Sequence, residues 1–211
     1  MSSTWACAVL AAGESRRLGS PKQLLLWQGE SLLRRATRCA LSCRAGRVGL
    51  VLGAHRAAVS ADVSGLEVEV LENSDYRQGI ASSIRRAVTW AEQYSSRGLL
   101  LMLCDQPRLT SSHLDALIDA ADANGTLVCS RYEGQRGVPA VFPVRYFKAL
   151  KRLRGDQGAR VLLRGSDSGD ADWARADASR AQRIVEIEWP EGAQDIDTVR
   201  DWRQLTGSSE I

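Results

Sequence analysis

Short apolar runs alternate along the chain with longer segments in which apolar residues recur at every third or fourth position. The runs have the length of buried strands, and the longer pattern is typical of helices with one buried face. Strands are predicted at Trp5–Leu10, Val48–Leu52, Glu67–Leu71, Leu99–Leu103, Thr126–Cys129, Pro139–Phe142 and Arg183–Glu188, the last an edge strand. This alternation predicts an α/β fold, a Rossmann-like three-layer sandwich with a mostly parallel sheet between helices.

Helical periodicity fills the intervals between these strands. Helices are predicted after Ser31, around Ala54–Ala61, over Ser82–Tyr94, after Ser111 or Ser112, over Tyr146–Leu153 and Ala159–Leu163, and from Asp197 to Leu205. Ser31, Ser111 or Ser112, and Asp197 are the expected N-caps, because their side-chain oxygens can accept hydrogen bonds from the free N–H groups of a first turn. The Gly-, Ser- and Asp-rich stretch Gly165–Ala181 is predicted to be a loop.

Composition limits the possible classes of protein. With 44% hydrophobic and 25% charged residues and no linker or repeat, the 211 residues are predicted to form one domain, residues 1–211. A net charge of +3 suits a nucleotide ligand and gives no sign of a nucleic-acid groove. Five cysteines without a C-x-x-C pair, and two histidines, argue against a zinc site or a disulfide scaffold. The apolar run Trp5–Ala12 is too short to span a membrane, so we expect a cytoplasmic protein.

A basic loop containing glycine follows the first strand, in the run Leu10-Ala11-Ala12-Gly13-Glu14-Ser15-Arg16-Arg17-Leu18-Gly19-Ser20-Pro21-Lys22. Glycine lets backbone N–H groups approach an anion, and three cations could stabilise a departing pyrophosphate. A solvated basic turn would explain the same residues without a ligand. Two other phosphate loops fail on spacing, since Pro21 precedes the lysine where a Walker loop has glycine, and Gly13 has no glycine two residues later.

Acidic residues follow the most apolar strand and precede the last helix. Asp105 lies in Cys104-Asp105-Gln106-Pro107, at a strand end where open α/β sheets place ligands and where its side chain is expected to face solvent. Asp197 lies in Asp195-Ile196-Asp197-Thr198. Carboxylates, phosphate oxygens and water are the usual ligands of Mg²⁺. Helix capping alone would explain either aspartate as well.

The run from Leu10 to Leu25 resembles the signature loop of the nucleotidyltransferase superfamily, L-A-A-G-x-S-x-R-x-G-x-P-K-x-L-L, most closely in the form of the molybdenum cofactor cytidylyltransferases. The resemblance implies the fold of the nucleotide-diphospho-sugar transferases. It implies that Arg17 and Lys22 hold the β- and γ-phosphates and are catalytic, whereas Arg16 falls at a variable position. The nucleotide-binding loop would comprise Leu10, Ala11, Ala12, Gly13, Ser15, Arg17 and Lys22.

The two acidic segments also match this family. The family's C-D-Q-P implies that Asp105 is catalytic and holds Mg²⁺, the expected cofactor, and that Gln106 lies on the acceptor side. The family's D-I-D-T-P-E-D implies that Asp197 is the second metal ligand and that Asp195 is structural. This chain has Val199-Arg200 where Pro-Glu is usual, a departure that concerns the start of the helix more than the metal.

Three further segments match in chain order. Asn73, Gly79 and Ser82 match N-x-x-x-x-x-G-x-x-S-S, which implies contacts with the nucleotide, although Ser82 could simply cap a helix. The patterns G-x-P-x-x-F and G-D-x-G-A-R match two later segments and imply contacts with the acceptor. The residues expected there are Gly137, Pro139, Asp156 and Arg160.

The resemblance implies Mg²⁺-dependent transfer of CMP from CTP to the phosphate of a molybdopterin-type cofactor, with release of pyrophosphate. CTP is expected over GTP because Ala12 gives L-A-A-G, where guanylyl-type enzymes have L-A-G-G. Two alternatives stay open: a guanylyl or other NTP transferase acting on a different phosphorylated small molecule, and a non-catalytic partner that delivers cofactor to a molybdoenzyme or its chaperone. Intact Arg17, Lys22, Asp105 and Asp197 favour an enzyme. No nucleic-acid or membrane partner is expected.

Overall fold

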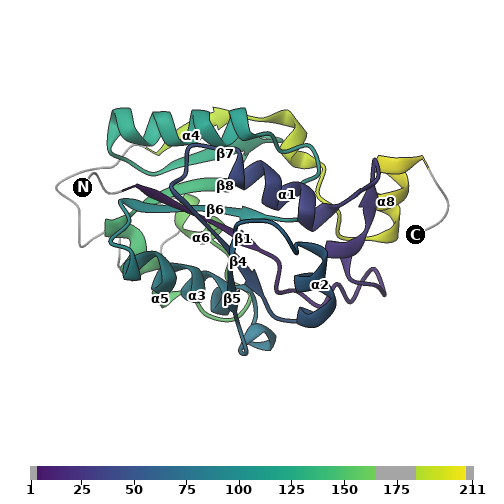
Figure 1. Cartoon of the computed structure of the whole chain (residues 1–211). Helices are drawn as coiled ribbons and strands as arrows, with labels where there is room; N and C mark the ends of the chain where they lie inside the picture. The colour runs from purple at the N-terminus through teal and green to yellow at the C-terminus, as the bar shows by residue number, and fades with distance from the viewer. Residues whose placement is uncertain (1–3, 165–183, 208–211) are drawn as a thin grey trace.

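The computed structural model describes residues 4–164 and 184–207, which form a seven-stranded sheet with helices on both faces (Figure 1). The strands are β1 (Trp5–Leu10), β4 (Arg47–Leu52), β5 (Glu69–Glu72), β6 (Gly98–Leu103), β7 (Val128–Tyr132), β8 (Gln135–Pro143) and β9 (Val185–Glu188). Their order is β5-β4-β1-β6-β8-β7-β9. Within this sheet β8 alone runs antiparallel to its neighbours, so the mostly parallel sheet is confirmed, and β9 is an edge strand as predicted.

Helices cover both faces of the sheet (Figure 1). One face carries α1 (Leu32–Leu41) and α4 (Ser111–Asn124), and the other carries α3 (Ile80–Gln93) and α5 (Phe147–Arg152). The shorter helices are α2 (Arg56–Asp62), α6 (Arg160–Leu163) and α8 (Val199–Thr206), with 3₁₀ turns η1 (Lys22–Leu24), η2 (Tyr76–Gln78), η3 (Val144–Tyr146) and η5 (Pro190–Ala193). A two-stranded hairpin is formed by β2 (Leu26–Trp27) and β3 (Glu30–Ser31).

Strand β1 shows why an unbroken apolar run predicts a central strand. All six of its residues are buried, although successive side chains point to opposite faces. Ala6, Ala8 and Leu10 join the cluster under α3 and α5, whereas Trp5, Cys7 and Val9 join the cluster under α1 and α4. A third, smaller cluster, which includes Trp202, packs α8 against the β2–β3 hairpin.

One predicted N-cap is confirmed and one helix start is moved. The Ser31 hydroxyl accepts a hydrogen bond from the Arg34 N–H and caps α1. Helix α3 begins two residues before the predicted start, because Gly79 turns the chain into it with φ of 90°. Ser82 therefore lies inside the first turn and does not cap, and its hydroxyl donates to the Gly79 carbonyl.

Two predicted N-caps are wrong. Helix α4 is capped by Thr110, whose hydroxyl accepts from the His113 N–H, and not by Ser111 or Ser112. Helix α8 is capped by Thr198, which forms a reciprocal capping box with Asp201. Both threonines have extended backbone directly before the helix, the conformation that a cap requires.

Two hairpins were not predicted. Strand β8 is longer than the expected Pro139–Phe142 and pairs with β7 through the turn at Glu133 and Gly134, whose φ angles are both positive. Gln28 and Gly29 turn the β2–β3 hairpin in the same way. Two successive residues with positive φ form tight hairpin turns that match the twist of the strands.

Two predicted features fall partly or wholly outside the described residues: the loop Gly165–Ala181, and the start of the strand predicted at Arg183–Glu188. Over the ranges 4–164 and 184–207, no helix combines the length and apolar character needed to cross a membrane.

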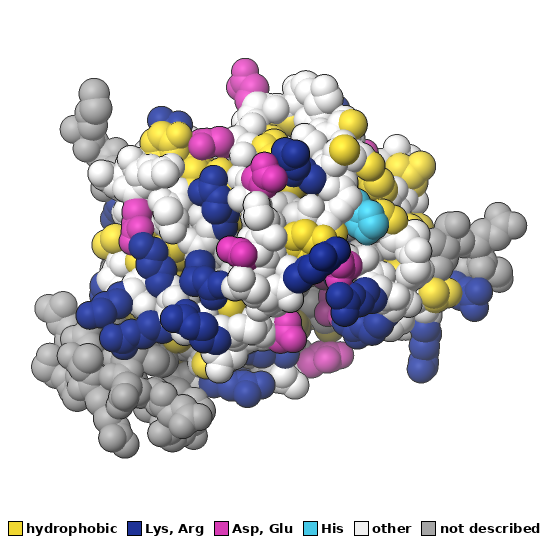
Figure 2. Space-filling view, turned by 90° about the horizontal axis from the view of Figure 1, so that it is seen from below, with side chains coloured by type: hydrophobic (Ala, Val, Ile, Leu, Met, Phe, Trp, Pro, Cys, Tyr) yellow, Lys and Arg dark blue, Asp and Glu magenta, His cyan; other side chains and the backbone are white. Residues whose placement is uncertain are grey.

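Basic side chains gather over the face that α3 and α5 cover (Figure 2). From Arg145 to Arg164 the chain has a single acidic residue, Asp156, and seven basic ones: Arg145, Lys148, Lys151, Arg152, Arg154, Arg160 and Arg164. Most of these seven are exposed. Such a surface raises the local concentration of polyanions around the segment predicted to contact the acceptor.

Candidate active site

The loop that leaves β1 is held in shape by its own polar side chains. Gln23 is fully buried, and its amide donates to the carbonyl oxygens of Ala11 and Gly13, each at 2.9 Å. The Ser15 hydroxyl accepts the Lys22 backbone N–H at 3.0 Å and lies 3.3 Å from the Gln23 side-chain oxygen. The Ser15 side chain therefore helps to shape the loop. Gln23 was missed, although a polar residue directly before the apolar run Leu24–Leu26 is a signal for such a role.

Two cations and two carboxylates meet at the ends of β1 and β6. The Lys22 Nζ donates to Asp105 Oδ2 at 2.5 Å and to Asp197 Oδ1 at 2.9 Å. The Arg17 Nη2 donates to Asp197 Oδ2 at 2.8 Å. The structure thus brings together the four residues assigned to catalysis and metal binding. Arg16 lies outside this cluster and pairs with Glu14 at 2.5 Å.

Backbone contacts bring the two carboxylates side by side. The Ile196 N–H donates to the Asp105 carbonyl at 3.0 Å, which attaches the Asp195–Thr198 segment to the end of β6. Capping of α8 is done by Thr198 and Asp201, and the Asp201 carboxylate also accepts the Asp197 backbone N–H. Capping, the alternative explanation for Asp197, is therefore excluded, and its side chain is directed to Lys22 and Arg17.

The expectation that Asp105 faces solvent is wrong. The residue is 6% exposed, because Lys22 and the Asp195–Thr198 segment cover it. Burial alone would lower the pKa of Lys22, but the adjacent Asp105 and Asp197 outweigh burial and raise that pKa above its usual range. Burial works to raise the pKa of Asp197, but Lys22 and Arg17 lower it overall. Lys22 and Asp197 are therefore both charged at neutral pH.

The two carboxylates suit a divalent cation that also binds phosphate. Asp105 Oδ1 is buried and has no hydrogen-bond partner in the described part of the chain, so it is an acceptor without a donor. Residues 4–164 and 184–207 contain no group of three or more His, Cys, Asp or Glu side chains placed to hold a metal. A cation held by Asp105 and Asp197 would complete its shell with phosphate oxygens and water, as Mg²⁺ commonly does.

In the segment after β5 that is predicted to contact the nucleotide, Asn73 and Ser82 are hydrogen-bonded within the segment. The Asn73 amide nitrogen donates to the hydroxyls of Ser82 and Ser83 at 2.9 and 3.0 Å, and all three residues are buried. Gly79 touches the acceptor loop, since a Cβ there would lie 2.3 Å from the Gly155 carbonyl oxygen. Asn73 and Ser82 are thus placed to shape the loop, and Gly79 permits its contact with Gly155.

Three of the predicted acceptor residues, Gln106, Gly137 and Arg160, lie around Tyr132, which was not predicted. The Tyr132 hydroxyl donates to the Val138 carbonyl at 3.2 Å, and the Gln106 amide donates to the same oxygen at 3.1 Å. A Cβ on Gly137 would lie 2.0 Å from that hydroxyl, so glycine is required beneath the ring. Burial raises the pKa of Tyr132, although the Arg160 guanidinium beside it opposes the shift.

The Glu133-Gly134 turn could have revealed this tyrosine. A two-residue turn places the residues on either side of it opposite one another, and the ladder pairs Tyr132 with Gln135. The pairing then brings the Tyr132 hydroxyl over Gly137. Pro139 and Asp156 complete the predicted set, and Asp156 lies against Gly79 and not beside Tyr132.

A half-buried histidine, His113, supports the strands beneath this region. The Ser130 hydroxyl donates to the Pro139 carbonyl at 2.8 Å, so its oxygen accepts from the His113 Nε2–H, also at 2.8 Å. The imidazole stacks on Trp189 with ring centroids 4.9 Å apart. Burial lowers the pKa of His113 from its ordinary 6.5 to about 4.

His113 is expected to make the protein less stable in acid. The unfolded chain binds a proton at this residue below about pH 6.5, whereas the folded chain binds it only near pH 4, so stability falls as the pH drops through that interval. The limit is about 1.4 kcal/mol per pH unit, reduced by solvent screening. Urea unfolding at several pH values should show a shallower slope for His113→Gln. The exposed His55, changed to Asn, is the control, and equal slopes for parent and His113→Gln would contradict the assignment.

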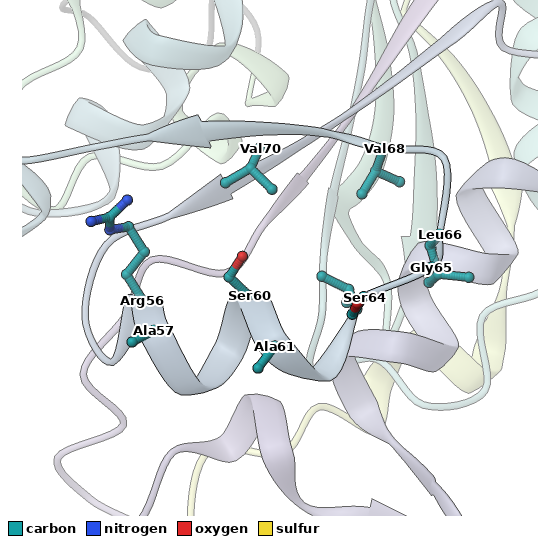
Figure 3. A pocket seen from close by; sticks show the side chains of 10 residues that line it. Arg56, Ala57, Ser60, Ala61, Ser64, Gly65, Leu66, Val68 and Val70 are labelled. Atoms are coloured by element: carbon teal, nitrogen blue, oxygen red, sulfur yellow. The ribbon is translucent and has the colours of Figure 1, made fainter.

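Two pockets elsewhere contain none of the predicted site residues. One, of about 540 Å³, lies between α2 and the chain leading into β5 (Figure 3), where Arg56, Ser60, Val68 and Val70 are among the lining residues. The other, of about 520 Å³, is lined by Trp27, Gln28, Arg35, Arg108, Thr110, Trp189, Glu191 and Leu205. The cluster of Lys22 and Arg17 with the two aspartates gathers the four predicted residues and is the candidate active site.

Comparison with known proteins shows the family of the chain. Residues 7–172 match the family described as the MobA-like NTP transferase domain. The chain belongs to this family. Among curated relatives of this MobA-like NTP transferase, the purine catabolism protein PucB of Bacillus subtilis is 30% identical over 189 residues, covering 86% of this chain and 90% of PucB.

Other relatives have different names. Nicotine blue oxidoreductase of Paenarthrobacter nicotinovorans is 31% identical over 165 residues, 74% of this chain and 79% of that protein. A probable molybdenum cofactor guanylyltransferase of Opitutus terrae is 28% identical over 163 residues, 77% of each chain. The names of these relatives therefore point to different roles.

A solved structure matches nearly the whole chain. Rv0371c of Mycobacterium tuberculosis superposes with a TM-score of 0.80 and 29% identity, covering 99% of this chain and 100% of Rv0371c. Another structure of Rv0371c is a complex with manganese, with a TM-score of 0.75 and 27% identity over 98% of this chain and 100% of that one. The fold is that of a nucleotidyltransferase, as predicted.

Proposed function

We propose that this nucleotidyltransferase moves CMP from CTP to the phosphate of a molybdopterin-type cofactor, with Mg²⁺ as its metal. The convergence of Lys22 and Arg17 on Asp105 and Asp197 carries the proposal. An acceptor phosphate oxygen attacks the α-phosphorus of CTP and forms the new P–O bond. The bond from the α-phosphorus to the oxygen that bridges to the β-phosphate breaks, and that oxygen leaves with pyrophosphate.

Each residue of the cluster has one task in this reaction. Lys22 and Arg17 bind the β- and γ-phosphates and stabilise the negative charge that develops on departing pyrophosphate. Asp105 and Asp197 hold the metal, which when bound offsets charge on the reacting phosphates. The acceptor needs no general base, because a phosphate monoester is already anionic near neutral pH. His113 is therefore free for its structural role beneath the acceptor side.

Gln106, Gly137, Pro139 and Arg160 are proposed to contact the acceptor, together with Asp156. Arg154 and Arg160 belong to the basic segment Arg145–Arg164, and this positive charge favours a doubly charged phosphate ester. All five cysteines are free, which supports a reducing cytoplasmic compartment. A molybdoenzyme or its chaperone is the proposed recipient of the product.

Pyrophosphate release tests the proposal. The purified protein is assayed with Mg²⁺, with each of CTP, GTP, ATP and UTP, and with molybdopterin-type cofactor, a sugar phosphate or an alcohol phosphate as acceptor. Rapid release with CTP and the molybdopterin-type acceptor is expected. Release with another pair would reassign the substrates to the alternative NTP transferase. No release with any pair would favour the non-catalytic delivery partner.

The base preference gives a separate prediction. Ala12 is 5% exposed and lies where a Cβ on Gly53 would meet both its methyl group, at 3.0 Å, and the Tyr76 side chain. The Ala12 methyl group therefore packs beneath the segment that carries Tyr76. Through this segment, the methyl group can indirectly limit the space for the nucleotide base. The parent is expected to prefer CTP, and Ala12→Gly to reduce the CTP/GTP ratio of kcat/KM by about tenfold.

Ala11→Gly is the matched control for this prediction. Ala11 is its direct neighbour and is equally buried, but it packs in the cluster on the opposite face of the sheet. Steady-state kinetics with both nucleotides measure the ratio in each variant. A parent that prefers GTP refutes the CTP assignment, and an equal loss in both variants shows general loosening of the loop.

A further inference from the structure

The oxygens of the two metal-binding carboxylates are almost all engaged by cations of the chain itself. Lys22 contacts one oxygen of Asp105 and one of Asp197, and Arg17 contacts the second oxygen of Asp197. The fourth oxygen, Asp105 Oδ1, is buried. A metal ion that uses both aspartates must therefore compete with Lys22 or Arg17 for ligands.

The charges of this cluster cancel. Two carboxylates contribute −2, and Lys22 and Arg17 contribute +2. A divalent cation that approaches the intact cluster therefore gains no net attraction from these four charges, and it meets the Lys22 ammonium between its own ligands. That ammonium is held firmly, since its side chain is 16% exposed and both contacts are charge-assisted.

The phosphates of the nucleotide can take both cations away from the carboxylates. Lys22 and Arg17 are the residues that the proposed function assigns to the β- and γ-phosphates. The Lys22 backbone is fixed by its N–H contact with Ser15, while its four-carbon side chain can move without moving the loop. Once both cations bind phosphate, the carboxylates have a net charge of −2, which a divalent cation neutralises.

We infer that the nucleotide opens the metal site by an exchange of ion pairs. Lys22 and Arg17 leave Asp105 and Asp197 to bind the triphosphate, and the divalent cation takes their place on the two carboxylates. This inference rests on the proposed roles of these four residues. It predicts that metal and nucleotide each raise the affinity for the other by the same factor, as linkage requires. The metal alone binds weakly because it must displace the Lys22 ammonium.

Binding of Mn²⁺ alone tests the exchange without turnover. Free Mn²⁺ is counted by electron paramagnetic resonance, in the absence of nucleotide, for the parent, Lys22→Met, Arg17→Met and Arg16→Met. Methionine keeps an unbranched side chain and removes the charge. Lys22→Met is expected to bind Mn²⁺ at least about tenfold more tightly than the parent, and Arg17→Met to show a smaller gain. Arg16→Met, which loses an ion pair with Glu14 outside the cluster, should equal the parent.

The outcomes separate this inference from the proposed function. Equal Mn²⁺ affinity in the parent and Lys22→Met overturns the exchange, and if the parent still binds Mn²⁺ tightly with CTP the proposed metal site stands. Failure of the parent to bind Mn²⁺ even with CTP overturns both. If Lys22→Met does not fold, Lys22→Gln and Arg17→Met provide the comparison. Thermal unfolding gives an independent measure, because Mn²⁺ should raise the Tm of Lys22→Met more than that of the parent.

Discussion

Asp105→Asn is expected to lower kcat by roughly a thousandfold or more, because the variant lacks the charge that holds the metal on the reacting phosphates. Asparagine keeps the size of the aspartate side chain and one of its oxygens, so the loss reports charge and not shape. Asp197→Asn should have the smaller effect, since this residue is more exposed and the amide oxygen of the variant could still bind a metal. Turnover is followed as pyrophosphate release with saturating CTP and Mg²⁺.

Stability must be measured alongside activity. Asp105 is buried against Lys22, so its substitution is expected to lower the free energy of unfolding by roughly 1–3 kcal/mol. The loss stays in this range because Lys22 keeps its contact with Asp197. Urea unfolding therefore defines conditions in which every variant is folded. Asp119→Asn is the control, because Asp119 lies on α4 and pairs with Arg44 away from the site. Near-parental turnover of folded Asp105→Asn would show that the metal assignment is wrong.

The strands of the sheet could be predicted because burial on both faces leaves an unambiguous apolar run. Every residue of β1 is buried, and all but the last of β6 are. Turns and helix caps were harder to predict from the sequence. Ser111 and Thr110 are chemically equivalent caps, and which of them precedes the helix depends on one residue's backbone angle. The tight turn at Glu133 and Gly134 gave no hydrophobic pattern, so its hairpin was missed.

The site could be predicted only through the family resemblance. Lys22 is separated from Asp105 by 83 residues and from Asp197 by 175, and no local pattern encodes those contacts. The resemblance assigned their roles but not their burial, because burial of Asp105 depends on Lys22 and the distant Asp195–Thr198 segment lying over it. Local signals could have singled out Gln23 and Tyr132, but the carbonyl groups to which they donate are identified only by the fold.

Lys22→Ala and Arg17→Ala are each expected to lower kcat by about a hundredfold or more, the scale of a lost contact to charge in the transition state. Arg16→Ala should stay within about twofold of the parent. Arg16 and Arg17 are adjacent and similarly exposed, at 79% and 68% of their side chains, but only Arg17 reaches Asp197, while Arg16 pairs with Glu14. Equal losses in these two variants would refute the residue-by-residue assignment.

The Lys22 variant also distinguishes a catalytic role from a structural one. Loss of a merely structural lysine would weaken metal binding and turnover together, because the carboxylates beneath it would lose their arrangement. If Lys22 both occupies the metal ligands and stabilises the departing pyrophosphate, its loss has effects of opposite sign. Mn²⁺ then binds more tightly in the absence of nucleotide, while kcat falls. Measuring both quantities on one preparation of Lys22→Ala, beside Arg16→Ala, decides between them, since a parallel fall in both would contradict the exchange.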